Sequence, residues 1–368
     1  MRIRRGTYGL NPIDKVLLFS AVALVALSLV FMHSATSDRN DPYAVSDMFI
    51  KQAVWGMVGI AFMLLMSRID YMRFVNIAYV LYAIALGMLV LIFLIGSSRY
   101  GAKRWIALGP ISLQPSEFVK IGVILALAAF MGDRREKIGT LSNFLMAVLL
   151  VSPAFLLIFA QPDLGTALIL MPILFGVMFI CGENVKYTIV TFSLGLMCLP
   201  VFWHILRDYQ KSRLLVFINP NLDPLGAGYT IIQSKIAVGS GGFLGKGWLG
   251  GTQSQLKFLP EKHTDFIFST IGEEWGFIGG MLLVTLYAVI VARAISLINE
   301  AGDIYAKAIA AGIATLLAFQ VFTNIAMTIG MMPVVGIPLP AISYGGSNTV
   351  TTLIGLGLLM SVARRARR

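Results

Sequence analysis

The sequence predicts an all-α polytopic membrane protein with about ten transmembrane helices. Of its 368 residues, 57% are hydrophobic and 13% are charged, whereas soluble domains carry about 25% charged residues. Apolar runs of membrane-spanning length recur along the chain. These runs are longer than the strands of a membrane β-barrel, which need about ten residues. The composition therefore indicates an integral membrane protein built of helices.

About ten apolar runs give the predicted spans. The run 118–131 is short, so we expect its helix to extend into the residues before it. The runs cover residues 16–34, 50–67, 74–96, 118–131, 141–160, 165–181, 187–205, 267–292, 306–330 and 349–363.

The lysines and arginines of the short loops predict that both termini are cytoplasmic, because such residues are enriched on the cytoplasmic side. The first outer loop, 33–49, has three aspartates against Arg39 alone. An even number of spans returns the C-terminal ARRARR to the cytoplasm. The basic residues placed there are Arg2, Arg4, Arg5, Lys15, Arg68, Arg73, Arg134, Arg135, Lys137, Lys186, Arg293, Lys307, Arg364, Arg365, Arg367 and Arg368.

This orientation places one large extracytoplasmic loop, residues 206–266, between the seventh and eighth helices. Two clusters of basic residues lie on the same outer face, against the usual bias. Lipid phosphates could hold each one singly, but a diphosphate substrate at the membrane surface would explain both clusters. The net charge of +11 is therefore no sign of nucleic-acid binding. The clusters are Arg99, Lys103 and Arg104, and Arg207, Lys211 and Arg213; the other outer segments are 97–117, 160–164 and 331–348.

Two outer segments resemble one another as helix starts, LQPSEFVK (113–120) and AQPDLGT (160–166). Pro115 and Pro162 suit the first turn of a helix, and Glu117 and Asp163 suit its positive end. Glu117 and Lys120 are three residues apart and can pair on one helix face. Helix capping and one ion pair would explain these residues, but charges inside spans are costly and are often functional.

Asp265, in LPEKHTDFIF (259–268), is the acid that we favour for catalysis. It could equally be the N-cap of the eighth span. Neighbouring His263 has no partner histidine at metal-binding spacing, and no nucleophilic serine motif of the G-x-S-x-G type occurs. A sugar transferase whose donor leaves as a lipid diphosphate needs no acid for the leaving group, so one carboxylate acting as base for the incoming hydroxyl suffices.

Two further outer segments are rich in glycine or proline. Residues 239–251, GSGGFLGKGWLGG, have Ser240 and Gly247 where a Walker-type phosphate loop needs Gly and Ser or Thr, so that motif is excluded. We expect these glycines to give flexibility or to allow close approach to a ligand. The preceding YTIIQSKIAVGS predicts a short interfacial helix. Residues 331–347 contain three prolines and three glycines, so we expect an irregular segment packed into protein.

These motifs together resemble the SEDS (RodA/FtsW) family, and they are QPSEFVK, AQPDLGT, PLPAISYGGS and the stretch from DPLGAGYTIIQ to STIGEEWG. The resemblance covers residues 15–362, and GTQSQLKFLPEKHTDFIF is closer to RodA than to FtsW sequences. It implies a single membrane domain over 1–368 with ten helices in the cell inner membrane. It also implies a peptidoglycan glycosyltransferase for cell elongation and rod shape, which polymerises lipid II into β-1,4 glycan strands outside the cytoplasmic membrane.

The resemblance also implies roles for particular residues. The Asp of the family's H-T-D-F motif, proposed as catalytic, is Asp265 here. Glu117 and Lys120 match the family's Q-P-S-E-x-x-K motif, and Asp163 matches its Q-P-D-L-G-T motif. Arg104 and Gln210 lie in KRW and DYQ contexts that also match the family. The residues implied to bind or support substrate are Glu117, Lys120, Arg104, Gln210 and Asp163.

The implied partners are lipid II, the growing glycan strand, the membrane, the elongation machinery and a class B penicillin-binding protein that supplies transpeptidation. Asp265 and a diphosphate could share a divalent cation, Mg²⁺ or Mn²⁺, but the sequence shows no set of protein ligands for one. Two alternatives remain open on the residues alone. A lipid II flippase would need polar groups through the membrane, and a scaffold without chemistry would need no acid beside basic clusters.

Overall fold

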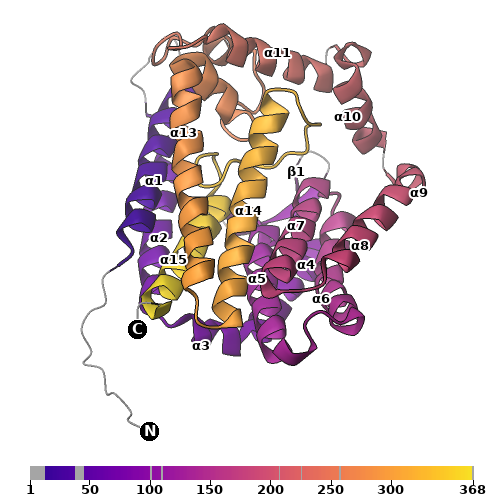
Figure 1. The fold of residues 1–368 in the computed structure, drawn as a ribbon. Helices are drawn as coiled ribbons and strands as arrows, with labels where there is room; N and C mark the ends of the chain where they lie inside the picture. Colours follow the sequence, from indigo (N-terminus) through magenta and orange to yellow (C-terminus); the bar gives the residue numbers. More distant parts are fainter. Residues whose placement is uncertain are drawn as a thin grey trace.

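The computed structural model describes residues 13–37, 45–99, 102–108, 111–206, 208–224, 226–256 and 258–366, and it forms a bundle of helices (Figure 1). The long apolar helices are α1 (Lys15–Thr36), α2 (Asp47–Arg68), α4 (Ala78–Ile95), α5 (Pro115–Asp133), α6 (Leu141–Ala160), α7 (Leu164–Cys181), α8 (Val185–Met197), α13 (Ile267–Glu300), α14 (Ile304–Thr328) and α15 (Gly346–Ala366). The short helices are α3 (Tyr71–Asn76), α9 (Leu199–Ile205), α10 (Asp208–Ile218), α11 (Ala227–Ser240) and α12 (Thr252–Gln255), with 3-10 turns η1 (Arg135–Lys137) and η2 (Pro220–Leu222).

The prediction of an all-α polytopic membrane protein is confirmed. Within the described part of the chain, 8 helices are long and apolar enough to cross a membrane. Two shorter apolar helices, Ala78–Leu94 within α4 and α8, occupy the two remaining predicted spans. The short fourth run begins at Pro115, so its helix does extend into the preceding residues as expected.

Three predicted spans differ from the observed helices. The run 74–96 is divided at Ile77, between α3 and α4. The run 187–205 is divided into α8 and α9, because Pro200 has no N–H to donate to the carbonyl of residue 196. The run 267–292 is interrupted at Gly276, whose φ of 63° and ψ of −156° are not helical. A conformation with positive φ is open to glycine at little cost, so the residue type permits this interruption.

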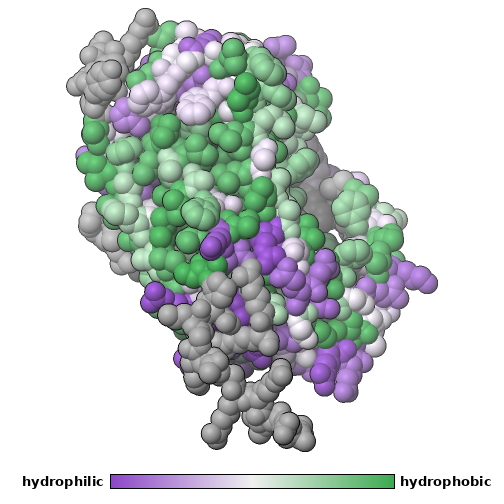
Figure 2. Space-filling view, turned by 60° about the vertical axis from the view of Figure 1, so that its left-hand side comes forward, coloured by the Kyte–Doolittle hydropathy of each residue, from purple (hydrophilic) through white to green (hydrophobic). Residues whose placement is uncertain are grey.

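The core of the bundle is formed by α5 and α15. In each, 89% of the apolar stretch is buried inside the protein, against 22% in α2. The outward-facing helices instead expose leucine, valine and phenylalanine side chains over much of their length. Figure 2 shows a broad hydrophobic surface across the middle of the molecule, with hydrophilic residues at its lower end and others along its upper edge. A lipid bilayer would cover this surface.

The two ends of the bundle differ. At one end, called here the terminal end, α1 begins and α15 ends (Figure 1). Ion pairs fasten both helices there, from Arg293 to Asp14 at 2.9 Å and from Arg365 to Asp70 at 3.2 Å. The opposite end, called the loop end, carries α10 and α11 (Figure 1).

A small sheet at the loop end was not predicted. Strands β1 (Ser97–Arg99), β2 (Ala102–Leu108) and β3 (Ile111–Leu113) form a three-stranded antiparallel sheet in the order β1-β2-β3. The sheet lies within the segment 97–117 and leads directly into α5, with Ile106 paired to Leu113. It positions Arg104 on its central strand.

The glycine-rich segment 239–251 packs on the interruption of α13. Its backbone N–H groups at Lys246 and Gly247 each donate to carbonyls of α13 at 3.0 Å. A Cβ on Gly245 would lie 2.1 Å from the carbonyl oxygen of Glu274, and φ at Gly245 is +81°. The glycines therefore permit close approach to another stretch of backbone, whereas we had expected flexibility or approach to a ligand.

Candidate active site

Asp265 lies in the turn that precedes α13. The helix begins at Ile267, and its N-cap residue is Phe266, which makes no side-chain capping bond. The alternative that Asp265 is the N-cap of this helix is therefore wrong. Its carbonyl oxygen accepts a hydrogen bond from Asn324 Nδ2 at 3.0 Å, so the backbone of the turn is held from α14.

Charged groups from separate parts of the chain act on the Asp265 carboxyl. The pKa of Asp265 is raised to about 6, chiefly by burial; Glu261 and Asp163 also act to raise it, whereas Arg213 and Arg104 act to lower it. At pH 7 such a group is roughly 90% ionised, yet it is a stronger base than an ordinary aspartate. The side chain remains partly exposed. These properties suit a general base that must be charged and accessible.

Arg104 reaches from β2 to the start of α7. Its guanidinium lies 3.6 Å from Asp163 Oδ1, and Nε donates to the carbonyl of Gln161 at 3.3 Å. A further N–H donates to the carbonyl oxygen of Pro162. The Arg104 side chain is 29% exposed, whereas that of Asp163 is 4% exposed. The guanidinium is thus anchored at one edge and open to an anion at the other.

Asp163 is the N-cap of α7. Its Oδ1 accepts from the Thr166 N–H at 3.2 Å and its Oδ2 from the Thr166 hydroxyl at 3.0 Å. The capping interpretation is confirmed for Asp163, which also pairs with Arg104. Pro162 was expected in the first turn, but it precedes the cap. Asp163 therefore holds a helix end and an arginine at once.

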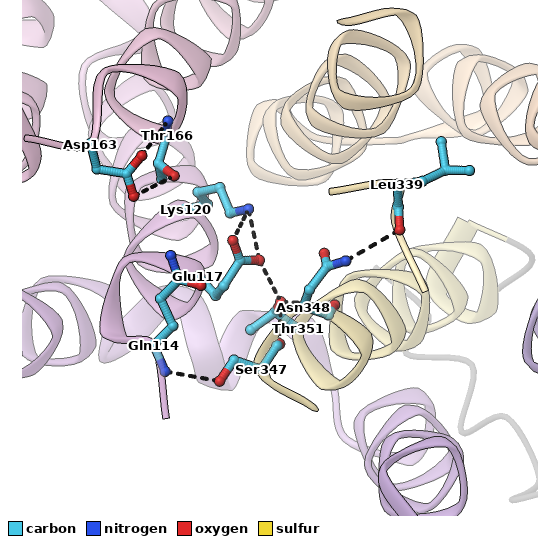
Figure 3. Close-up of polar contacts among 9 residues, drawn as sticks. All are labelled: Gln114, Glu117, Lys120, Asp163, Thr166, Leu339, Ser347, Asn348 and Thr351. Atoms are coloured by element: carbon cyan, nitrogen blue, oxygen red, sulfur yellow. Dashed lines mark hydrogen bonds and ion pairs between the residues drawn. The ribbon is translucent and has the colours of Figure 1, made fainter. Parts of the chain in front are cut away.

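Glu117 and Lys120 form a buried ion pair on α5 (Figure 3). Both carboxylate oxygens lie 2.8 Å from the ammonium, and each side chain is 2% exposed. The Thr351 hydroxyl of α15 donates to Glu117 at 3.4 Å. The predicted pairing is confirmed, and Pro115 does occupy the first turn. The cost of removing two charges from water offsets much of their attraction, so a buried pair of this kind contributes little net stability.

Helix α10 supplies Gln210 and Arg213. Gln210 is buried, with 6% of its surface exposed, whereas Arg213 is exposed and donates to the carbonyl oxygen of Val334 at 3.1 Å. The structure thus brings Arg213, Arg104 and Asp163 within electrostatic reach of Asp265. Of the other basic residues singled out in the sequence, Arg207 and the side chains of Arg99 and Lys103 lie outside the described residues.

The residues beside Asp265 form its surroundings. The Glu261 carboxylate accepts the Thr264 hydroxyl at 3.0 Å, and Lys262 donates to the carbonyl of Ser254. The His263 ring lies 6.0 Å from that of Tyr344, and burial lowers the pKa of His263. The sequence alone assigns no role to Glu261, Lys262 and His263, because their contacts form only when the chain folds.

Three residues that hold the Asp265 turn or lie against it were not predicted from the sequence. Asn324 of α14 is fully buried and donates to the turn. The Ser343 hydroxyl donates to the carbonyl oxygen of Thr264 at 2.7 Å. Gly336 lies so near that a Cβ there would be 3.3 Å from Asp265 Oδ2. One signal could have found Asn324, since an amide within an apolar span is expensive and usually has a purpose.

A metal site would need several ligand side chains close together. Among the described residues, no three His, Cys, Asp or Glu side chains lie close enough together to hold a metal ion. A divalent cation at Asp265 would therefore take most of its ligands from the phosphate oxygens of a substrate and from water, as Mg²⁺ often does.

Comparison with known proteins places the chain in a family. A family model described as "Cell cycle protein" and named for FtsW, RodA and SpoVE matches residues 14–368. The chain belongs to the FtsW/RodA/SpoVE family. Two relatives in this family are peptidoglycan glycosyltransferase MrdB of Escherichia coli K12, 39% identical over 95% of this chain and 93% of that protein, and peptidoglycan glycosyltransferase RodA of Treponema pallidum, 33% identical over 99% of this chain and 100% of that protein.

Solved structures of FtsW/RodA/SpoVE relatives share the fold. The crystal structure of RodA from Thermus thermophilus is 30% identical with a TM-score of 0.72 and covers 97% of this chain and 98% of that one. A chain from a structure titled "Structural coordination of polymerization and crosslinking by a peptidoglycan synthase complex" is 35% identical with a TM-score of 0.81 over 97% of this chain and 99% of that one. The expected RodA-type membrane fold is thus confirmed.

Proposed function

We propose that this chain is a peptidoglycan glycosyltransferase that polymerises lipid II into β-1,4 glycan strands, with Asp265 as its catalytic base. The observation that carries the proposal is the Asp265 carboxyl, whose pKa is raised to about 6 and on which the charges of Arg213 and Arg104 act. It makes no helix cap. The names of the MrdB and RodA relatives support the reaction class.

In the proposed reaction, the 4-hydroxyl of the acceptor sugar attacks the anomeric carbon of the donor. The hydroxyl proton passes to an oxygen of Asp265 as the new C–O bond forms, and the bond from the anomeric carbon to the diphosphate breaks. The electron pair of that bond leaves with undecaprenyl diphosphate. Because attack comes from the face opposite the leaving group, an α-linked donor becomes a β-linked product.

Arg104 and Arg213 are proposed to meet the negative charge that grows on the departing diphosphate. Guanidinium groups bind phosphate oxygens through paired hydrogen bonds. Arg104 keeps part of its surface exposed beside Asp163, and Arg213 is exposed on α10. Charge stabilisation of this kind would assist bond cleavage without proton transfer to the leaving group.

The proposed setting is the cell inner membrane, with the loop end outside the cell. The basic residues of the terminal end favour that orientation by the positive-inside rule. The chain would act as one membrane domain, with segment 206–266 as its large outer loop, and would supply glycan strands to a class B penicillin-binding protein in the elongation machinery. The peptidoglycan synthase complex among the similar structures supports a partner of this kind. A flippase is less well supported, because the charged groups around Asp265 gather at the loop end.

The test is polymerisation of purified lipid II by the purified chain, alone and with its penicillin-binding partner. Asp265→Asn removes the base while keeping the shape of the side chain, and it should leave no measurable glycan product. Asp47→Asn is the matched control, because Asp47 is exposed at the start of α2 and should be dispensable. Normal product from Asp265→Asn would refute the assignment of the base.

A further inference from the structure

The segment 331–345, called here the crossing segment, runs over the loop end without helix or strand; Ile337 and residues 339–343 are buried, and most of the others are half-buried. Buried backbone groups need hydrogen-bond partners, and several of this segment's partners lie in the Asp265 turn or in α14. The Tyr344 N–H donates to the carbonyl of His263 at 2.8 Å. The Ser343 hydroxyl accepts from the Leu339 N–H at 2.8 Å and donates to the carbonyl of Thr264 at 2.7 Å.

Asn324 joins the crossing segment to the Asp265 turn with one amide group. Its Nδ2 donates to the carbonyl oxygen of Asp265 at 3.0 Å and to that of Ile337 at 2.8 Å. Both partners are acceptors, so the nitrogen of the amide must face them and the orientation of the group is fixed. Asn324 has 0% of its surface exposed, which leaves the amide no room to exchange these partners for water.

The carbonyl of Ile337 follows Gly336, and Gly336 lies against the catalytic carboxyl. Its φ is +71°, and a Cβ there would be 3.3 Å from Asp265 Oδ2. The backbone of the crossing segment therefore covers one side of that carboxylate and keeps water from that side. We infer that Asn324 is a positioning residue, which clamps the crossing segment against the Asp265 turn and so fixes both the place and the hydration of the base.

The inference rests on the proposed role of Asp265 and adds to it. A buried asparagine that served only to satisfy two carbonyls would affect the amount of folded protein and nothing else. A positioning residue must change the chemistry of the base. When the clamp is removed, the crossing segment can withdraw and water can reach the carboxyl, so the pKa of Asp265 should fall toward that of an ordinary aspartate, because burial is the main cause of its elevation.

The experiment measures lipid II polymerisation by the purified full-length chain, with its partner where activity requires it, over a range of pH. Asn324→Leu keeps the size of the side chain and removes both donors. We expect kcat to fall about 10- to 100-fold, as for a displaced catalytic group, with KM changed less than about twofold. The acid limb of kcat/KM, which reports the free enzyme's base, should move to lower pH by at least about half a unit.

The groups that act on Asp265 from neighbouring elements stay in place in this experiment. They are Glu261 in the same turn, Arg213 of α10, Asp163 before α7 and Arg104 of β2. Thr323→Val is the matched control, because Thr323 is the adjacent buried residue and its hydroxyl has no hydrogen-bond partner among the described residues. Its kcat and acid limb should equal those of the unaltered chain.

A second variant covers the case in which Asn324→Leu does not fold. Asn324→Ser keeps a polar group that is too short to reach both carbonyls, and it should show the same two changes at smaller size. An unchanged acid limb in either folded variant would overturn the inference, whatever happens to kcat. Failure of both variants to accumulate, while Thr323→Val does, would also overturn it, because Asn324 would then be needed for folding.

Asp265→Asn, tested in parallel, separates this inference from the proposed function. If Asp265→Asn is inactive and Asn324→Leu is normal, only the role of Asn324 is wrong. If Asp265→Asn is active, the base itself has been assigned wrongly, and the acid limb in all variants reports some other group.

Discussion

Glu117 and Lys120 face each other one turn apart on α5, with both carboxylate oxygens 2.8 Å from the ammonium. Removing one partner leaves the other charged and buried, which costs about 3–5 kcal/mol. We predict that Lys120→Met lowers the free energy of unfolding of the purified protein by about 3–5 kcal/mol. The double variant Glu117→Gln/Lys120→Met should regain most of that free energy.

Polymerisation should not return with stability in that double variant. The measurements are thermal unfolding in detergent and glycan synthesis on the same preparations. If the double variant makes glycan at the normal rate, the pair contributes only to packing, and Glu117 and Lys120 have no part in handling substrate.

The pH dependence of catalysis should follow the Asp265 carboxyl, whose pKa is about 6. The base must be ionised to accept a proton, so kcat/KM should be half-maximal near pH 6 and fall about tenfold for each unit below it. Initial rates of lipid II consumption from pH 4.5 to 8 would measure this limb. A rate that stays level down to pH 4.5 would be inconsistent with this base.

Asp265→Asn should make the folded protein more stable at pH 7 while it abolishes activity. The folded-state pKa lies above the unfolded value, so ionisation disfavours the folded state, and stability is lost as pH rises from about 4 to about 6. The neutral amide escapes this loss. We expect a gain of about 1 kcal/mol at pH 7, after allowance for partial exposure, and no gain at pH 4, both measured by thermal unfolding.

Glu261 and Arg213 should shift the acid limb in opposite directions. The Glu261 carboxylate raises the pKa of Asp265 and the Arg213 guanidinium lowers it. Glu261→Gln, which can still accept the Thr264 hydroxyl, should move the limb to lower pH, and Arg213→Gln should move it to higher pH. The pH profiles of the two variants provide the measurement, and shifts of the same sign would show that these charges do not act on the base.

The glycines of segment 239–251 should differ in what they tolerate. Gly245→Ala forces a Cβ toward the carbonyl of Glu274, at a φ of +81° that is strained for residues other than glycine. This variant should lower the free energy of unfolding by about 1–3 kcal/mol. Gly239→Ala meets nothing within 4 Å and lies in α11, where alanine is favoured. Thermal unfolding of the two variants should separate them clearly, and equal stability would mean that the packing on α13 is loose.

The helices could be predicted because apolar runs of membrane-spanning length need only local information. The interruption at Cys198 follows from Pro200. The interruption at Gly276 depends on a positive φ, and the sequence alone does not say which glycine in an apolar run adopts one. The sheet β1–β3 was missed because two of its strands, β1 and β3, have only 3 residues each. Strand pairing of that kind depends on packing against α4 and α5 more than on residue type.

The candidate site was predicted in part. The sequence indicated Asp265 as cap or base, and the observed start of α13 at Ile267 decides against the cap. The clamp by Asn324 could not be predicted, because it joins residues 59 and 13 positions away along the chain. Such contacts depend on how an irregular segment packs, and no periodicity in the sequence reports that.

The contact between Arg104 and Asp163 has a consequence for turnover. The guanidinium already has a carboxylate 3.6 Å away, so a departing diphosphate would compete with an internal anion for it. Exchange of one anion for another is less favourable than neutralisation of a bare cation, so in the proposed reaction the leaving group would be held less tightly. An enzyme that must discharge a lipid diphosphate after every added unit gains from an arginine that is never left without a counter-ion.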